Sequence, residues 1–227
     1  MTTSTYPDEL ATLDPSSWND YLRQHSHLPG PRANLSLVDA FVHQAGSAQI
    51  ESALATDEEF LVLCGVAALS DTQRLRGYAS DARWRVREGV ALSLQHLGDR
   101  DPGALHDLVL TWASDADPLV QRAAVAAICE PRLLTSSPAA AVARSVCHIA
   151  TSALVARPSS TRREPDVRVL RQALGYGWSV AIAADPEPGL AAFTTLQSSG
   201  DPDVAWVVRE NLKKARLKRL LPASDRQ

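Results

Sequence analysis

The chain has 227 residues, a formal net charge of −3, and 45% hydrophobic and 22% charged residues. This composition is typical of a chain that folds around a core, and it argues against an intrinsically disordered protein. Aromatic residues make up only 5% of the chain, while alanine and leucine dominate its apolar residues, so we expect helices rather than strands.

The three cysteines, Cys64, Cys129 and Cys147, lie far apart in the sequence and include no C-x-x-C pair. We expect buried free thiols in a reducing cytoplasm rather than a disulfide framework or a zinc site. The six histidines show no metal-binding spacing, and no nucleotide-binding or hydrolase motif occurs, so neither a metal nor a cofactor is expected. The N-terminus lacks the pattern of a signal peptide, and without a stretch of about 18 apolar residues no membrane span is expected.

The N-terminal part of the chain is acidic, with nine acids and two arginines in its first 60 residues. Residues 1–14 are expected to form a flexible tail. A helix is predicted to begin near Pro15, because proline is favoured in the first turn of a helix. Residues 27–34 carry two prolines around a glycine and predict a turn, after which residues 35–45 predict the next helix.

From about residue 55 onward a pattern recurs in which an acid is followed, five positions later, by valine and a helical run. Its copies are Asp57…Val62, Asp81…Val86, Asp115…Val120, Glu164…Val169 and Asp203…Val208. Each acid is expected to cap the second helix of a helix pair. Segments such as residues 102–114 and 136–155 are long enough for the first helix, and residues 156–166 predict a polar loop.

Three of these copies resemble HEAT repeats: DARWRVREGVALSL (81–94), DADPLVQRAAVAAI (115–128) and DPDVAWVVRENLKK (201–214). The resemblance extends over roughly residues 55–215 and implies stacked antiparallel helix pairs in a curved array. The expected fold is therefore all-α, an α-solenoid of about five HEAT-like helix pairs. Residues 15–221 are expected to form this single repeat domain, and residues 222–227 a C-terminal tail.

Helical periodicity over residues 83–97 places Val86, Val90 and Leu94 on one stripe, which should face the core. Trp84, Glu88, Ala91 and Gln95 then lie on the opposite side. In the second helix of a HEAT pair, that side usually lines the concave groove. The same register yields two columns of groove positions: Phe60, Trp84, Pro118, Val167 and Trp206 in one, and Cys64, Glu88, Arg122, Arg171 and Glu210 in the other.

Exposed aromatic rings beside charges are typical of recognition surfaces. We therefore expect Trp84, Arg122, Arg171, Trp206 and Glu210 to contact a partner in the groove. The alternative is that both tryptophans pack against neighbouring repeats and that the charges form salt bridges between repeats. Trp112 and Trp178 lie in runs rich in alanine and leucine and are expected in the core.

The segment from Arg209 to Arg219 holds six basic residues and includes all three lysines of the chain. One interpretation is a surface for an acidic partner or a phosphate backbone. The other is a solvated helix end, where cations also suit the helix dipole.

The leading functional hypothesis is a non-catalytic binding module or scaffold whose groove holds a peptide or helix of a partner protein. Another interpretation is an accessory or inhibitory subunit of a larger assembly that docks through its acidic N-terminal part. A cytoplasmic location is expected for each.

The enzyme hypothesis comes from a more distant resemblance to bacterial HEAT-like alkylpurine DNA glycosylases. Sites in that family place a tryptophan and a carboxylate one helical turn apart, with an arginine in a following repeat; Trp84, Glu88 and Arg122 are similarly spaced. The resemblance implies duplex DNA as the partner and Glu88 as the catalytic carboxylate in hydrolysis of the N-glycosidic bond of alkylated bases. The chain departs from the family in its glutamate and in its acidic net charge, and Trp206 and Glu210 repeat the same spacing.

Overall fold

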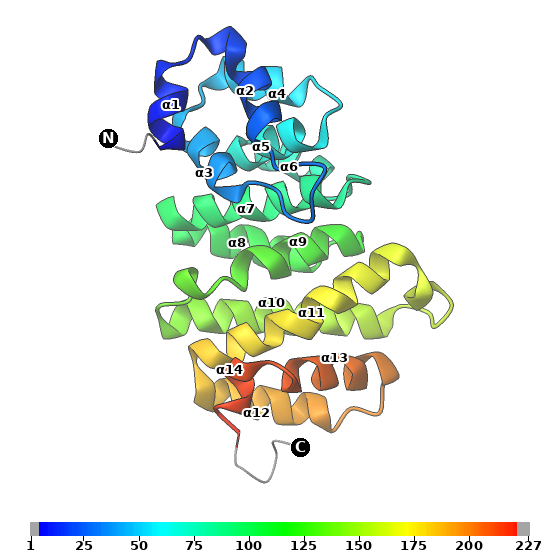
Figure 1. The fold of residues 1–227 in the computed structure, drawn as a ribbon. Coiled ribbons are helices and arrows are strands. Elements are labelled where there is room, and N and C mark those ends of the chain that lie inside the picture. Colours follow the sequence, from blue (N-terminus) through cyan, green and yellow to red (C-terminus); the bar gives the residue numbers. More distant parts are fainter. Residues whose placement is uncertain (1–4, 222–227) are drawn as a thin grey trace. The chain divides into compact units, whose positions relative to one another are not determined.

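The computed structural model describes residues 5–221, and all the regular secondary structure within them is helical (Figure 1). The expected C-terminal tail, residues 222–227, lies outside the described residues. The chain divides into two compact units, Met1–Ser93 and Leu94–Gln227. The division falls inside one continuous helix, α7 (Trp84–Arg100).

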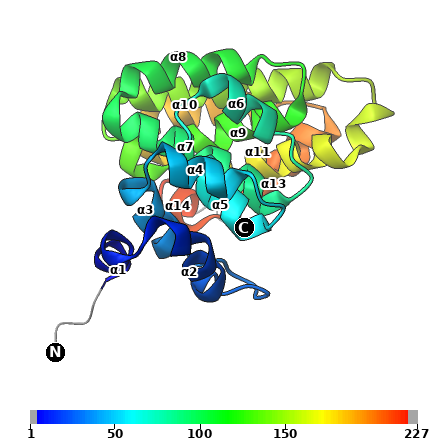
Figure 2. The same cartoon turned by 90° about the horizontal axis from the view of Figure 1, so that it is seen from above.

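The first unit is built around α5 (Glu59–Ala68), in which every residue from Phe60 to Ala67 is buried. A helix that is apolar on all sides belongs in a core. Its other elements are α1 (Tyr6–Thr12), η1 (Pro15–Ser17), α2 (Trp18–His25), α3 (Leu35–Gln44), α4 (Ser47–Leu54), α6 (Thr72–Tyr78) and the start of α7. Figures 1 and 2 show α4 beside α5 and α1 beside α3.

Sequence-based helix starts are confirmed in the first unit. Asp14 accepts a hydrogen bond from the backbone N–H of Ser16 at 2.8 Å and so caps the turn that leads into α2. Asn34 caps α3 by accepting the N–H of Leu37 at 3.2 Å. Both are residue types that favour the N-cap position, because a short side-chain oxygen can reach a free amide of the first turn.

Helix α1 lies where the sequence predicted a flexible tail. The Asp8 carboxylate accepts hydrogen bonds from the Thr5 N–H (3.3 Å) and hydroxyl (2.6 Å), and Pro7 lies in the first turn. Leu10 is buried in the core of the unit. A single buried leucine gives no periodicity to detect, so the threonine and aspartate three residues apart were the available indication of this helix.

The second unit is centred on α11 (Pro165–Ala184), which packs against α9, α10, α12 and α13. The other elements are α8 (Pro102–Ala113), α9 (Pro118–Ile128), η2 (Pro131–Leu133), α10 (Ser137–Ala156), η3 (Thr161–Arg163), α12 (Pro186–Gln197), α13 (Pro202–Leu212), α14 (Ala215–Lys218) and the end of α7. Trp112 and Trp178 are buried here as predicted.

The acids predicted to cap the repeated helices are wrong for α5, α9 and α13. In α5 the N-cap residue is Glu58 rather than Asp57. Asp117 and Asp201 are the N-caps of α9 and α13, two residues away from the predicted Asp115 and Asp203. Pro118 and Pro202 explain the difference, because proline favours the first helical position and the residue before it then becomes the cap. Asp115 instead accepts the N–H of Asp117 at 2.9 Å.

The core stripe predicted for α7 is confirmed, since Val86, Val90 and Leu94 are all fully buried. Ala91, which was expected on the open side, is buried as well. Three positions assigned to the groove columns are also core: Phe60, Cys64 and Val167. The register identified the core stripe of α7 but not the burial of Ala91, and it could not be carried to α5, which is buried on all sides, or to Val167 on α11.

All three cysteines are buried free thiols, as predicted. Burial raises the pKa of Cys64. The sulfur atoms of Cys129 and Cys147 lie 3.6 Å apart, and the hydrogen bond between them, together with burial, raises the pKa of Cys147. A thiol with a raised pKa is a poor nucleophile, so Cys64 and Cys147 serve as small core residues.

Helix α10 shows that the sequence-based exclusion of any long apolar segment was too strong. Its 20 residues have the length and hydropathy of a membrane-crossing helix. It also contacts α8, α9, α11 and α13, and 44% of its most apolar window is buried inside the protein. Those contacts are typical of a core helix of a helical protein.

Candidate functional site

Trp84, the first residue of α7, is 52% exposed although tryptophan has the largest side chain of the common amino acids. Leu35, the first residue of α3, is 56% exposed. Both belong to the lining of one pocket of about 470 Å³ in the first unit. Leu63 and Leu92 also line it, with Pro31, Arg32 and Ala33 from the turn before α3.

The position of Trp84 is fixed by the residues on either side of it. Arg83 binds the Asp81 carboxylate at 2.8 Å and the backbone carbonyl of Asp57 at 3.1 Å. The hydrogen bond from Arg83 holds the pKa of Asp81 below its ordinary value. The turn before α7 is therefore tied to the turn before α5, and this fixes the backbone on which Trp84 stands.

Arg85 is a member of this site that sequence reasoning missed. Its guanidinium carbon lies 4.6 Å from the centre of the Trp84 ring. The same group binds Glu59 at 2.9 Å and the Gly30 carbonyl at 3.0 Å, so it links α7, α5 and the turn before α3. Neighbouring residues in a helix point about 100° apart. Periodicity therefore gave no reason to pair Arg85 with Trp84.

Glu88 lies one helical turn after Trp84 and lines the same pocket. The predicted tryptophan and carboxylate are thus brought to one cavity. Arg122, the third residue of that prediction, lies on α9 in the second unit. Neither compact unit by itself brings all three residues together.

Trp206, by contrast, is packed between α11 and α13. A side-chain carbon added at Gly175 would lie 2.9 Å from its ring, so the ring rests directly on α11. The Arg171 guanidinium lies over the Trp206 ring, 4.7 Å from its centre, and binds Asp203 at 2.5 Å. This is the alternative raised from the sequence, in which tryptophan packs against a neighbouring helix.

Glu210 and the basic segment that follows it are engaged with their own unit. Glu210 binds Lys213 at 2.6 Å, and this hydrogen bond lowers the pKa of Glu210. Arg216 donates to the Tyr176 hydroxyl at 2.8 Å, and Lys214 lies 5.8 Å from the Tyr176 ring centre. Arg216 and Lys214 thus lie around Tyr176 of α11, whereas the other basic residues of the segment are exposed: Arg209, Lys213, Lys218 and Arg219.

No group of three or more His, Cys, Asp or Glu side chains gathers to hold a metal ion among residues 5–221. Comparison with protein-family models, with curated proteins and with solved structures finds no match. The Trp84 pocket must therefore be interpreted from its own geometry.

Proposed function

We propose that the protein is a cytoplasmic binding module of HEAT-like helix pairs, and that its Trp84 pocket takes a bulky apolar side chain from a partner protein or peptide. The observation that carries the proposal is the shared position of Trp84 and Leu35. Among the described residues, the large hydrophobic side chains that are exposed are these two and Tyr176. Two of the three therefore meet at one pocket.

The size and lining of the pocket support this proposal. Its volume of about 470 Å³ lies within the ~300–1,000 Å³ typical of ligand sites. Covering the exposed part of a tryptophan removes on the order of 100 Å² of apolar surface from water, which contributes about 2.5 kcal/mol to binding. Because Arg83 and Arg85 already hold the segment around Trp84, little ordering cost opposes that gain.

The charges at the pocket favour a partner segment that also carries a carboxylate. Arg85 is held by Glu59, whereas the exposed Arg32 forms no ion pair within the described residues. An amphipathic helix with an apolar residue and an acid one turn apart would fill the pocket and pair with Arg32.

The test is selection of binders from a library of helical peptides, followed by affinity measurements on the intact protein. Selected peptides should share a bulky apolar residue near an acid. Trp84→Ala should weaken their binding at least tenfold and Leu35→Ala severalfold. Tyr176→Ala, which removes an exposed aromatic ring outside the pocket, should leave affinity unchanged. Peptides that bind Trp84→Ala as tightly as the parent protein would refute the proposal.

A second function, hydrolysis of the N-glycosidic bond of an alkylated base, is favoured by one observation: Trp84 and Glu88 line the same pocket. A carboxylate near a departing cationic base can stabilise positive charge and orient water. The assay is release of methylated purine from alkylated duplex DNA. This function requires that Glu88→Gln abolish release while Glu210→Gln, which alters the other Trp-x-x-x-Glu pair, has no effect. Absence of release by the parent protein would exclude it.

A further inference from the structure

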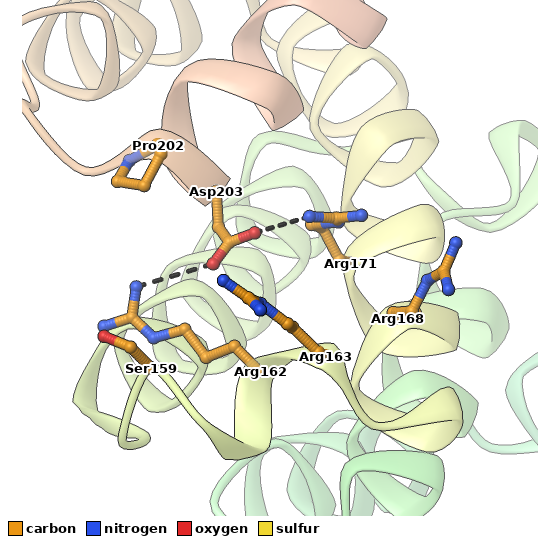
Figure 3. A pocket seen from close by; sticks show the side chains of 7 residues that line it. All are labelled: Ser159, Arg162, Arg163, Arg168, Arg171, Pro202 and Asp203. Carbon is orange, nitrogen blue, oxygen red and sulfur yellow. Dashed lines mark hydrogen bonds and ion pairs between the residues drawn. The ribbon is translucent and has the colours of Figure 1, made fainter.

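A second pocket, of about 390 Å³, lies in the second unit where η3 and the start of α11 meet the start of α13. Arginine dominates it. The lining residues are Ser159, Arg162, Arg163, Arg168, Arg171, Pro202 and Asp203 (Figure 3). The sequence explains the gathering. Arg162 and Arg163 are separated from Pro165, the first residue of α11, by Glu164 alone, and Arg168 and Arg171 lie one turn apart on that helix.

Two of the four arginines are held in place by carboxylates. Asp203 binds Arg171 at 2.5 Å and Arg162 at 3.5 Å, and Arg162 also binds Asp201 at 2.6 Å. These contacts raise the pKa of Arg162, with the hydrogen bond to Asp201 as the main cause. Figure 3 shows Asp203 between Arg162 and Arg171, with both of its oxygens engaged.

The other two arginines add positive charge to the pocket. Within the described residues, Arg163 and Arg168 form no ion pair, yet both line the pocket. Arg171 also has a buried Nε with no hydrogen-bond partner. Counting Asp201 and Asp203 against the four guanidinium groups, the pocket keeps a net charge of about +2 and many free N–H donors.

We propose that this pocket binds the phosphate group of a small phosphorylated compound. Guanidinium groups present planar pairs of N–H donors that match the oxygens of phosphate, and a doubly charged anion offers enough acceptors for several arginines. The anion would relieve the repulsion among like charges that the structure gathers at one place. This proposal is independent of the Trp84 pocket.

The lining and the charge of the whole chain favour a small compound over a nucleic acid. The pocket contains no aromatic side chain on which a base could stack. The chain also carries a net charge of −3, whereas proteins that bind long polyanions usually present a broad basic face. A single phosphate or a pyrophosphate matches this small, strongly basic pocket better.

The experiment is calorimetric titration of the full chain with inorganic phosphate, pyrophosphate and sulfate at low ionic strength. Phosphate and pyrophosphate should bind saturably, and pyrophosphate more tightly. The double variant Arg163→Gln/Arg168→Gln should weaken binding at least tenfold. Arg209→Gln, an exposed arginine of the same unit outside the pocket, should change affinity less than twofold. Circular dichroism of each variant confirms that its helices remain.

Three results would overturn the proposal. One is the absence of saturable binding of phosphate and pyrophosphate to the parent protein. Another is an equal loss in Arg209→Gln, which would mark general attraction of anions to the unit. The third is binding of a duplex DNA oligonucleotide that depends on Arg163 and Arg168 while phosphate and pyrophosphate neither bind nor compete, since the site would then belong to a nucleic-acid backbone.

Discussion

Asn211 is a buried polar side chain that joins two helices of the second unit. It is fully buried on α13, where its amide donates to the Leu174 carbonyl of α11 at 2.9 Å and accepts the Ser179 N–H at 2.8 Å. Its amide also donates to the Val207 carbonyl of α13 at 2.8 Å, so two of its three hydrogen bonds cross the helix interface. Sequence reasoning missed it, because one asparagine in a basic segment resembles a surface residue.

Replacing Asn211 with alanine should destabilise the protein. The change leaves a buried carbonyl and N–H without their partner, which costs about 1–3 kcal/mol. Urea unfolding followed by circular dichroism measures the effect. Asn19→Ala is the matched control, since Asn19 is partly exposed and its bonds to Ser52 lie at the surface, where water replaces them. Equal losses in the free energy of unfolding for the two variants would mean that the buried hydrogen bonds of Asn211 contribute no more stability than the exposed ones of Asn19.

Trp84 and Trp206 show where residue-level prediction stops. The repeat register assigns both to the same position, yet Trp84 is half exposed at a pocket and Trp206 rests on α11. Both rings have an arginine over them, Arg85 and Arg171, so the difference comes from Gly175, whose missing side chain leaves room for the Trp206 ring on α11. A helix's own periodicity cannot predict this, because the deciding residues belong to the neighbouring helix.

At the scale of elements, local chemistry predicted the helices that begin with strong start residues. Helix α3 begins after Asn34, as predicted. The repeat pattern also predicted α9 and α13, but their caps are Asp117 and Asp201, each followed by proline, rather than Asp115 and Asp203. These features act within one turn and are visible in the sequence. The sequence did not predict the short helix α1. Its position depends on the burial of Leu10 against residues that are distant in the sequence.

Two glycines within helices should respond oppositely to the same substitution. A side-chain carbon at Gly77 in α6 would meet nothing within 4 Å, so Gly77→Ala should stabilise the protein by about 0.5–1 kcal/mol through helix propensity. A carbon at Gly189 in α12 would lie 2.8 Å from the Ile182 Cα of α11. Gly189→Ala should therefore destabilise by about 1–3 kcal/mol, because backbone must move.

Thermal unfolding of the two variants beside the parent protein is the measurement, and each variant serves as the control for the other. A common direction of change would contradict the argument. The result would then follow from alanine's propensity alone rather than from the close approach of α12 to α11.

At the scale of the whole chain, composition correctly predicted an all-helical protein, since alanine and leucine periodicity is a property of many residues together. The expectation of one repeat domain came from the same pattern, whereas the structure groups the residues into two compact units divided inside α7. A continuous amphipathic helix shows no break at that point, so the sequence offers no sign of the division.

The Trp84 pocket was partly predicted, through Trp84 and Glu88, because both lie on one helix. The arginine pocket was not, because its residues come from η3, α11 and α13.

The same charge pairs that shape the arginine pocket make the stability of the protein depend on pH. Burial by itself would raise the pKa of Asp201, but hydrogen bonds from Arg162 and from the backbone N–H groups of Val204 and Asp203 outweigh it and lower that pKa below the ordinary value near 3.8. A carboxyl whose pKa is lower in the folded state favours folding fully above its unfolded pKa. That contribution is lost as the pH falls through the folded value.

Asp201→Asn should therefore reduce the free energy of unfolding most at pH 6, and the difference from the parent protein should shrink steadily between about pH 4 and pH 2. Urea unfolding at a series of pH values measures this difference. Asp107→Asn is the matched control, because Asp107 is exposed on α8 and forms no ion pair within the described residues. Its difference from the parent should stay small and flat across the range. A difference for Asp201→Asn that persists unchanged at pH 2 would show that the aspartate acts through its shape and neutral hydrogen bonds, and that the charge pair with Arg162 contributes no stability.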